Sequence, residues 1–509
     1  MSNNTPDGEV STADQVSEPA ADESRVRRRI GLGLGIVLAV LVYFVLPDSL
    51  SPEGHVTAAI AVLMAVWWMT EAIPIPATAL LPLVLFPFLG VAEIDAVASP
   101  YANDTIFLFM GGFVLALAMQ RWNLHRRIAL GIVAAVGTSP TMLVAGFMLA
   151  TGFVTMWVSN TATAIMMLPI GLSVLTLMNQ SDKGKSDANF ATALMLGIAF
   201  AASIGSVSTL IGTPPNALMR AYLSEEHDID VGFGQWMVVG VPLAAVFLVL
   251  AWLVLTKLVF RPTITEIAGG RDLIRDELHK LGPMSRGEKT VAAVFVCAAL
   301  SWVFIPLLAD TESVGGALPW LSNISDAGIA MAVAVVLFLL PVDGRRGVPA
   351  VDWDTASQLP WGILLLFGGG LSLSSQFTDS GLSEWIGEQV GVLEGVPAWV
   401  IILVVAATVL LLTELTSNTA TAAAFLPIMG GVALGMGMDI MTLIVPTALA
   451  ASMAFMLPVA TPPNAIAFGS GYVRIGEMVR GGVWLNAISL VLIMIVMYTL
   501  VPLVFNVSI

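Results

Sequence analysis

Two short polar motifs lie inside strongly apolar sequence, and each occurs twice in the same order. Ser-Asn-Thr occupies residues 159–161 and again 417–419, and Thr-Pro-Pro-Asn occupies 213–216 and again 461–464. Both motifs recur about 250 residues further along the chain, which indicates an internal duplication. Hydroxyl, amide and carbonyl oxygens are the ligands that hard cations such as Na⁺ prefer. The N-termini of broken helices suit a carboxylate, because they offer N–H groups and a positive dipole end.

Composition predicts a membrane protein. The 509 residues are 57% hydrophobic and 11% charged, and the mean hydropathy is +0.89. Apolar runs of about 17–25 residues, the length that crosses a bilayer, recur along the chain. The single Cys297 and four scattered histidines favour neither a disulfide nor a metal-ligand cluster. We therefore expect an all-α polytopic membrane protein embedded in the lipid bilayer, not an enzyme, and with no nucleic-acid partner.

The basic residues predict the orientation, because Lys and Arg collect on the cytoplasmic side. About eleven charge-poor segments are expected to cross once: 30–46, 56–70, 77–92, 105–120, 191–219, 236–256, 290–308, 327–341, 360–377, 443–470 and 482–505. With a cytoplasmic N-terminus, these crossings place every Lys and Arg except Arg220 on the cytoplasmic side and the C-terminus outside. We expect a multi-pass protein of the plasma (inner) membrane.

The segments 141–178 and 398–438 are left out of that count, because each has a Ser-Asn-Thr motif near its centre. Two full crossings with a turn would need roughly 40 or more residues, so length and the polar tip favour a re-entrant hairpin. Two crossings would also return the chain to the same side, so orientation does not distinguish the two. Irregular backbone at membrane depth must be buried in protein or line a watery cavity. The two tips are therefore expected to face each other inside the protein.

An odd number of spans separates the copies, so the two repeats should have inverted topology, as in many transporters. Consecutive prolines remove N–H donors and should break the helices 191–219 and 443–470 at mid-membrane. The expected organisation is as follows: an acidic, disordered cytoplasmic tail 1–27, a first repeat 28–256, a cytoplasmic linker with a surface helix 257–289, and a second repeat 290–509.

Glu71 and Glu414 lie within apolar sequence, where a carboxylate usually marks function. Glu414 is three residues before Ser417 and could bond the hairpin backbone or carry a proton. We favour a structural role for both carboxylates. For the repeated motifs themselves, the structural alternative is that their Ser and Thr residues only pack helices together and their prolines only kink them. The recurrence of two motifs in register argues against it.

At these motifs the chain resembles the divalent anion/sodium symporter family, the dicarboxylate and citrate carriers, over about residues 30–505. The strongest matches are the stretch 70–78, both Ser-Asn-Thr tips and both Pro-Pro-Asn loops. The resemblance implies a scaffold domain, a mobile transport domain that moves as an elevator, and a homodimer formed through the scaffold.

Carried over by position, the resemblance implies two Na⁺ sites and one substrate site. The first Na⁺ would be bound by Thr155, Ser159, Asn160 and Gly212, and the second by Thr413, Thr416, Asn418 and Ala460. Substrate carboxylates would meet Asn160, Thr161, Thr213 and Pro214 from one repeat, and Asn418, Thr419, Thr461 and Pro462 from the other. Backbone carbonyls supply some of these ligands.

The expected function is Na⁺-coupled import of C4-dicarboxylates such as succinate, malate and fumarate. The linker 257–289 is shorter than the soluble insertion that is frequent in sulfate-carrying relatives. A Na⁺-independent dicarboxylate exchanger on the same fold, and a citrate or sulfate carrier, are the alternatives. Moving one charge against 100 mV costs about 2.3 kcal/mol, so import of a dianion requires cation coupling or exchange.

Overall fold

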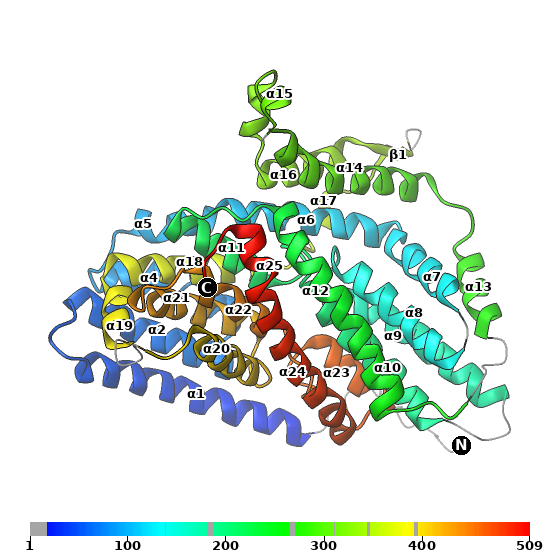
Figure 1. Cartoon of the computed structure of the whole chain (residues 1–509), viewed down its shortest axis with the longest axis horizontal. Helices are drawn as coiled ribbons and strands as arrows, with labels where there is room; N and C mark the ends of the chain where they lie inside the picture. The colour runs from blue at the N-terminus through cyan, green and yellow to red at the C-terminus, as the bar shows by residue number, and fades with distance from the viewer. Residues whose placement is uncertain are drawn as a thin grey trace, which may run out of the picture.

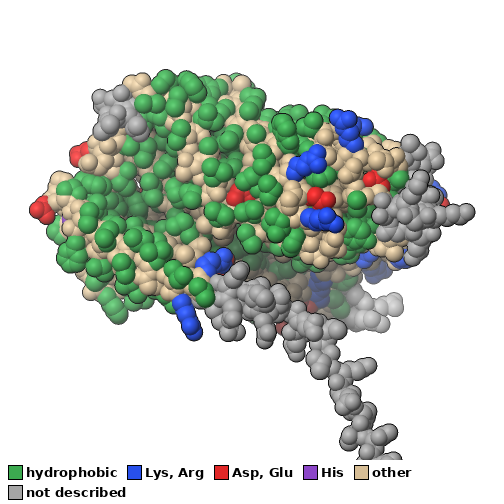
Figure 2. Space-filling model, turned by 90° about the horizontal axis from the view of Figure 1, so that it is seen from below, with side chains coloured by type: hydrophobic (Ala, Val, Ile, Leu, Met, Phe, Trp, Pro, Cys, Tyr) green, Lys and Arg blue, Asp and Glu red, His purple; other side chains and the backbone are tan. Residues whose placement is uncertain are grey.

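The computed structural model describes residues 18–137, 139–181, 187–264, 270–309, 311–343, 347–390 and 395–509. This part of the chain is almost entirely helical, and its strands are one short antiparallel pair, β1 (Pro341–Asp343) and β2 (Val348–Pro349). Nine of its helices are long and apolar enough to cross a membrane. The face in Figure 2 is mostly hydrophobic with few charged side chains. The expected all-α membrane fold is confirmed.

The first half of the chain runs through the following elements: α1 (Glu18–Val45), α2 (Pro52–Thr70), α3 (Ile75–Thr78), α4 (Leu81–Phe88), α5 (Ile94–Ala98), η1 (Ser99–Ala102), α6 (Asp104–Arg121), α7 (Leu124–Val136), α8 (Pro140–Thr155), α9 (Asn160–Ser181), α10 (Ala188–Ser206), α11 (Pro214–His227), α12 (Phe233–Leu253), η2 (Val254–Val259) and α13 (Gly270–Lys280). Of these, α13 lies within the linker that was expected to contain a surface helix.

The second half comprises α14 (Arg286–Ala309), α15 (Glu312–Gly315), η3 (Pro319–Asn323), α16 (Asp326–Leu339), α17 (Trp353–Ala356), α18 (Trp361–Asp379), α19 (Leu382–Gln389), α20 (Ala398–Thr413), α21 (Asn418–Gly435), α22 (Met441–Ala451), α23 (Pro462–Gly469), α24 (Ile475–Tyr498) and α25 (Leu500–Phe505). In Figure 1, α14 and α16 lie along the top edge and α1 along the bottom edge, and the helices that contain the repeated motifs lie between them.

Two expectations from the sequence need correction. Residues 1–17 of the tail that was expected to be disordered through residue 27 lie outside the described residues, whereas residues 18–27 belong to α1. Pro19 in the first turn and the good helix formers that follow it explain why the helix starts early. The segment 77–92 is not one continuous helix, because it contains the end of α3 and the eight-residue α4. Pro76 and Pro82 lie in the first turns of these two helices, where the missing N–H donor of proline is tolerated.

Both segments with Ser-Asn-Thr are helical hairpins. Helices α8 and α9 enclose the tip 156–159, and α20 and α21 enclose the tip 414–417. Both Thr-Pro-Pro-Asn segments are interrupted helices, with loop 207–213 between α10 and α11 and loop 452–461 between α22 and α23. The paired prolines open α11 and α23, because a helix tolerates missing N–H donors in its first turn.

The halves of the two interrupted helices pack crosswise. Helix α10 contacts α23 and α11 contacts α22, so each half-helix packs against the opposite half of the other repeat. The second arms of the hairpins follow the same rule, since α9 contacts α23 and α21 contacts α11. This reciprocal packing brings both tips and both loops to one place.

Close packing between α8 and α10 depends on Gly205. A Cβ at this position would overlap the carbonyl oxygen of Gly152 and come within 2.6 Å of the Thr155 Cγ2. We expect Gly205→Val to push the two helices apart at a cost of roughly 1–3 kcal/mol and to lower the Tm. Gly131→Val on α7 is the matched control, because no heavy atom lies within 4 Å of its added Cβ. Equal Tm values for the two variants in detergent would contradict this prediction.

Candidate substrate and cation site

The two tips and the two loops surround one cavity of about 700 Å³. All predicted site residues except Thr155 and Thr413 line it: Ser159, Asn160, Thr161, Gly212, Thr213, Pro214, Thr416, Asn418, Thr419, Ala460, Thr461 and Pro462. These residues come from four segments of the chain that lie between positions 159 and 462. The fold brings together what the repeated motifs predicted as one site.

Four helix N-termini point their positive ends toward this cavity. Helices α9, α21, α11 and α23 begin at Asn160, Asn418, Pro214 and Pro462, all of which line it. Each N-terminus is equivalent to roughly half a positive charge. Among the described residues, Arg27 is the single Lys or Arg of the lining. The centre of the cavity is therefore positive because of backbone dipoles, which suits an anion.

A cluster of oxygens lies behind the first tip. The fully buried Thr155 Oγ1 is 2.7 Å from Asn160 Oδ1 and 3.1 Å from the carbonyl oxygen of Ala202. The Asn160 amide also lies 3.4 Å from Ser206 Oγ. Helices α8 and α10 both end at this cluster, so their negative carbonyl ends face it. Oxygen ligands and negative dipole ends together suit a cation.

The second repeat builds the same cluster. Thr413 Oγ1 is 2.7 Å from Asn418 Oδ1 and 2.9 Å from the carbonyl oxygen of Ala451. The Thr416 hydroxyl instead donates to Leu412 O and lies 2.6 Å from the Thr421 hydroxyl. The Thr416 hydroxyl is thus hydrogen-bonded within its own hairpin. The carbonyls of Ala202 and Ala451 were not predicted, because a backbone ligand leaves no signal in residue type.

The asparagine of each Pro-Pro-Asn motif closes its loop. Asn216 Nδ2 donates to Val207 O (3.1 Å) and Thr209 O (2.9 Å). Asn464 Nδ2 donates in the same way to Ala454 O (3.3 Å) and Leu457 O (3.1 Å). Both side chains are fully buried, and these bonds tie each asparagine to two carbonyls of its own loop. The sequence contained the signal, since both asparagines belong to the repeated motif, but no role was predicted for them.

The buried carboxylate of Glu414 holds loop 452–461. It is 1% exposed and accepts hydrogen bonds from Asn486 Nδ2 and from the backbone N–H groups of Phe455, Met456 and Leu457, at 2.7–3.1 Å. The favoured structural role fits this geometry, although the bonded backbone belongs to the loop and not to the hairpin. The equivalent position of the first repeat is Met156, whose carbonyl accepts a bond from the Thr209 hydroxyl in the shorter loop 207–213.

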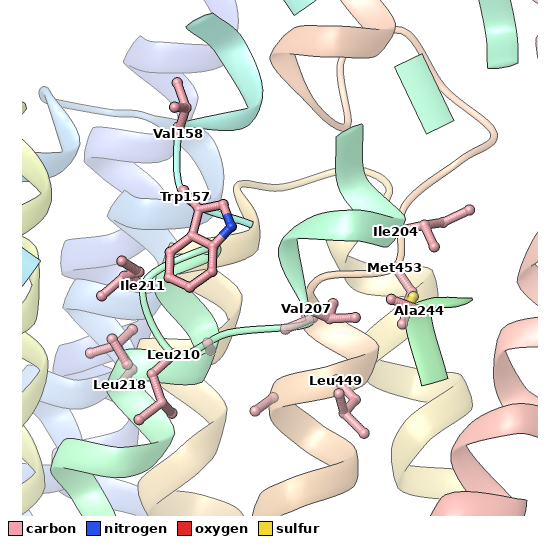
Figure 3. Close-up of a cluster of buried hydrophobic side chains, with 14 of the residues drawn as sticks. Trp157, Val158, Ile204, Val207, Leu210, Ile211, Leu218, Ala244, Leu449 and Met453 are labelled. Carbon is pink, nitrogen blue, oxygen red and sulfur yellow. The ribbon is translucent and has the colours of Figure 1, made fainter. Parts of the chain in front are cut away.

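An apolar cluster supports the first tip and its loop. Trp157 of the tip stacks on Phe233 of α12, with ring centroids 6.1 Å apart. Figure 3 shows Trp157 and Val207 in the same buried cluster as Leu449 and Met453 from the other repeat. Because these side chains come from both halves, the two loops are fixed relative to each other. A hydroxyl pair, Thr213 Oγ1 and Ser452 Oγ at 3.3 Å, links the loops directly.

The two ends of α11 lie in different surroundings. Its N-terminus faces the cavity, whereas the buried Arg220, halfway along the helix, lies 3.3 Å from both Asp104 at the start of α6 and Asp230. Glu226 accepts hydrogen bonds of 2.7 Å from the Ser375 and Thr378 hydroxyls of α18. Burial raises the pKa of the Glu226 carboxyl, and these hydroxyls oppose the increase. Polar contacts thus join α11 to α6 and α18.

Comparison with known proteins agrees with the motifs. Residues 29–506 match the family described as the transmembrane region of sodium:sulfate symporters. The sodium-dependent dicarboxylate transporter SdcS of Staphylococcus saprophyticus is 44% identical over 490 residues, which cover 95% of this chain and 93% of that protein. The protein of the same name from Staphylococcus aureus is 42% identical over 486 residues, 94% of this chain and 92% of its own.

Two solved structures share the fold at low identity. The YdaH transporter of Alcanivorax borkumensis aligns with a TM-score of 0.55 at 14% identity, covering 88% of this chain and 98% of its own. Neisseria gonorrhoeae MtrF aligns with a TM-score of 0.54 at 12% identity, covering 95% and 96%. Since the family match extends over nearly the whole length, the chain belongs to the sodium:sulfate symporter family and is a membrane transporter, not an enzyme.

Proposed function

We propose that this chain is a secondary active transporter that imports C4-dicarboxylates such as succinate, malate and fumarate together with Na⁺. The observation that carries the proposal is the polarity of the site: four positive helix ends line one cavity, and an oxygen cluster at negative helix ends lies behind each tip. An anion and two cations can therefore bind close together without a buried basic side chain. The relatives named sodium-dependent dicarboxylate transporters support this substrate class.

The near-symmetric tips suit a substrate with two carboxylates. In this proposal one carboxylate meets Asn160 and Thr161, and the other meets Asn418 and Thr419. The remaining contacts to the two carboxylates come from the loops, through Thr213 and Pro214 in the first repeat and Thr461 and Pro462 in the second. Sodium is bound by Thr155, Ser159, Asn160 and Gly212 in the first repeat, and by Thr413, Thr416, Asn418 and Ala460 in the second. Each asparagine then contacts both a cation and the anion, which couples the binding of the two.

Transport proceeds, in this proposal, by an elevator motion of the hairpins and interrupted helices against a scaffold that also forms a homodimer. The cavity reaches the surface beside Arg27 and Glu71, which are about half exposed. With the N-terminus in the cytoplasm and the C-terminus outside, this opening faces the cytoplasm. The polar contacts of Arg220 and Glu226 then close the outer side in this state, and they must break when the transport domain moves.

Uptake of radiolabelled succinate into proteoliposomes tests the proposal. We expect uptake with an inward Na⁺ gradient and none with K⁺ in its place. Two Na⁺ per dianion carry no net charge, so stimulation of uptake by an inside-negative potential would show that more than two Na⁺ move with each dianion. Uptake that ignores Na⁺ but needs internal dicarboxylate would instead assign an exchanger. Competition by sulfate or citrate that exceeds competition by malate would overturn the substrate class.

A further inference from the structure

The mouth of the cavity contains a charged pair that none of the predicted sites includes. Arg27 of α1 and Glu71 at the end of α2 both line the cavity, and Arg27 Nη2 lies 3.6 Å from Glu71 Oε2. Within the described part of the chain, no other Lys, Arg, Asp or Glu belongs to the lining. Any anion that enters or leaves through this mouth passes these two groups.

Close packing of α1 on α2 fixes where Arg27 lies. A Cβ at Gly31 would overlap the Thr70 hydroxyl, and one at Gly35 would lie 2.5 Å from the Trp67 ring. Residues 27, 31 and 35 are spaced four apart and therefore share one face of α1. Arg27 is one turn before Gly31, so it reaches Glu71, the residue after Thr70. The close helix packing at these two glycines thus places the Arg27 guanidinium at the mouth of the cavity.

Glu71 occupies a position that local backbone preference disfavours for glutamate. Its backbone is left-handed, with φ 49° and ψ 40°, and it caps the C-terminus of α2, where its N–H donates to Trp67 O. Glycine or asparagine is the usual residue in such a position, and a carboxylate at the negative end of a helix is unfavourable. Strained residues of this kind concentrate at functional sites. We therefore infer that the Glu71 carboxylate has a role other than capping the helix.

The pair is too loose to be important for stability. Its side chains are 50% and 45% exposed, and exposed ion pairs contribute about 0–1 kcal/mol. A guanidinium has five N–H donors in a planar fork, and one distant carboxylate does not occupy them. Arg27 consequently retains donors that can bind a second carboxylate in a bidentate manner.

We propose that Arg27, oriented by Glu71, is a mouth subsite that binds a carboxylate of the dianionic substrate on its way between the aqueous phase and the tips. The inference rests on the proposed function and adds a contact that acts from one side of the membrane. A positive group at a cavity mouth raises the local concentration of anions and the rate of their association. Lipid headgroup phosphates have the same chemistry, so the test must separate the two sources.

The test compares succinate transport in inverted and right-side-out membrane vesicles, which present opposite faces of the protein. We expect Arg27→Gln to raise the KM about fivefold in inverted vesicles, where the mouth faces the medium, and to leave the KM in right-side-out vesicles unchanged. The salt dependence of the KM should weaken and the maximal rate should stay the same. Arg27→Lys should give an intermediate KM, because it keeps the charge and loses the fork.

Arg29→Gln is the matched control, because it removes the same charge from the same helix at a residue that does not line the cavity. Glu71→Gln should change the KM only when Arg27 is present, and an additive effect in Arg27→Gln would refute the orienting role. An unchanged KM in Arg27→Gln, or equal shifts from both sides, would overturn the subsite. A KM shift in Arg27→Gln that occurs only in vesicles containing anionic lipid would overturn the subsite as well. Failure of the wild type to transport dicarboxylate would instead reject the proposed function.

Discussion

Asn160→Ala and Asn418→Ala should each reduce succinate transport by at least about 100-fold while expression and folding are kept. Each asparagine places its Oδ1 in an oxygen cluster with a buried threonine hydroxyl, and each begins a helix at the cavity. The substitution therefore removes a cation contact and a substrate contact together. Hydrogen bonds to charged groups contribute about 1.5–3 kcal/mol each, and 1.4 kcal/mol corresponds to tenfold.

The measurement is Na⁺-driven uptake in proteoliposomes, together with the rise of Tm that Na⁺ and succinate produce in detergent. We expect both variants to lose the succinate-dependent rise. Asn189→Ala is the matched control, because Asn189 is an exposed asparagine at the start of α10 that donates to Arg261 O. It should transport like the wild type. Normal uptake in either cavity variant would refute the site assignment.

Glu414→Gln should lower transport by about 10- to 100-fold and weaken the binding of one Na⁺. All partners of this carboxylate are N–H donors, so they match two ionised oxygens. A glutamine amide turns one acceptor into a donor that faces the backbone N–H groups, and each buried bond lost costs about 1–3 kcal/mol. Loop 452–461 then loses its anchor, and with it the placement of Ala460 and Thr461 in the cavity lining.

The dependence of uptake on Na⁺ concentration tests this role. We expect a higher half-saturating concentration and a Tm below that of the wild type. Glu384→Gln, at an exposed position of α19, is the control and should change neither quantity. If Glu414 carried a proton instead, Glu414→Gln would keep its Na⁺ affinity and lose the pH dependence of transport. That outcome would contradict the anchoring role.

Much of the fold follows from local sequence signals. Paired prolines end one helix and open the next wherever the chain places them, so both interruptions were predictable without the fold. Both hairpins were predictable as well, because each has a short polar tip between two apolar arms. The errors also have local causes: helix formers after Pro19 extend α1, and the prolines after Glu71 divide the segment 77–92.

The sequence by itself determined which residue types form the site, because the duplicated motifs place hydroxyls, amides and helix starts at fixed spacings within each repeat. Only the tertiary structure decided the partners that lie far away in the chain. The Ala202 and Ala451 carbonyls join the threonine and asparagine oxygens, Glu414 reaches a loop some 40 residues later, and Arg27 meets Glu71. Backbone ligands and contacts between helices depend on how helices cross and pack, which is set by shape and burial and not by residue spacing.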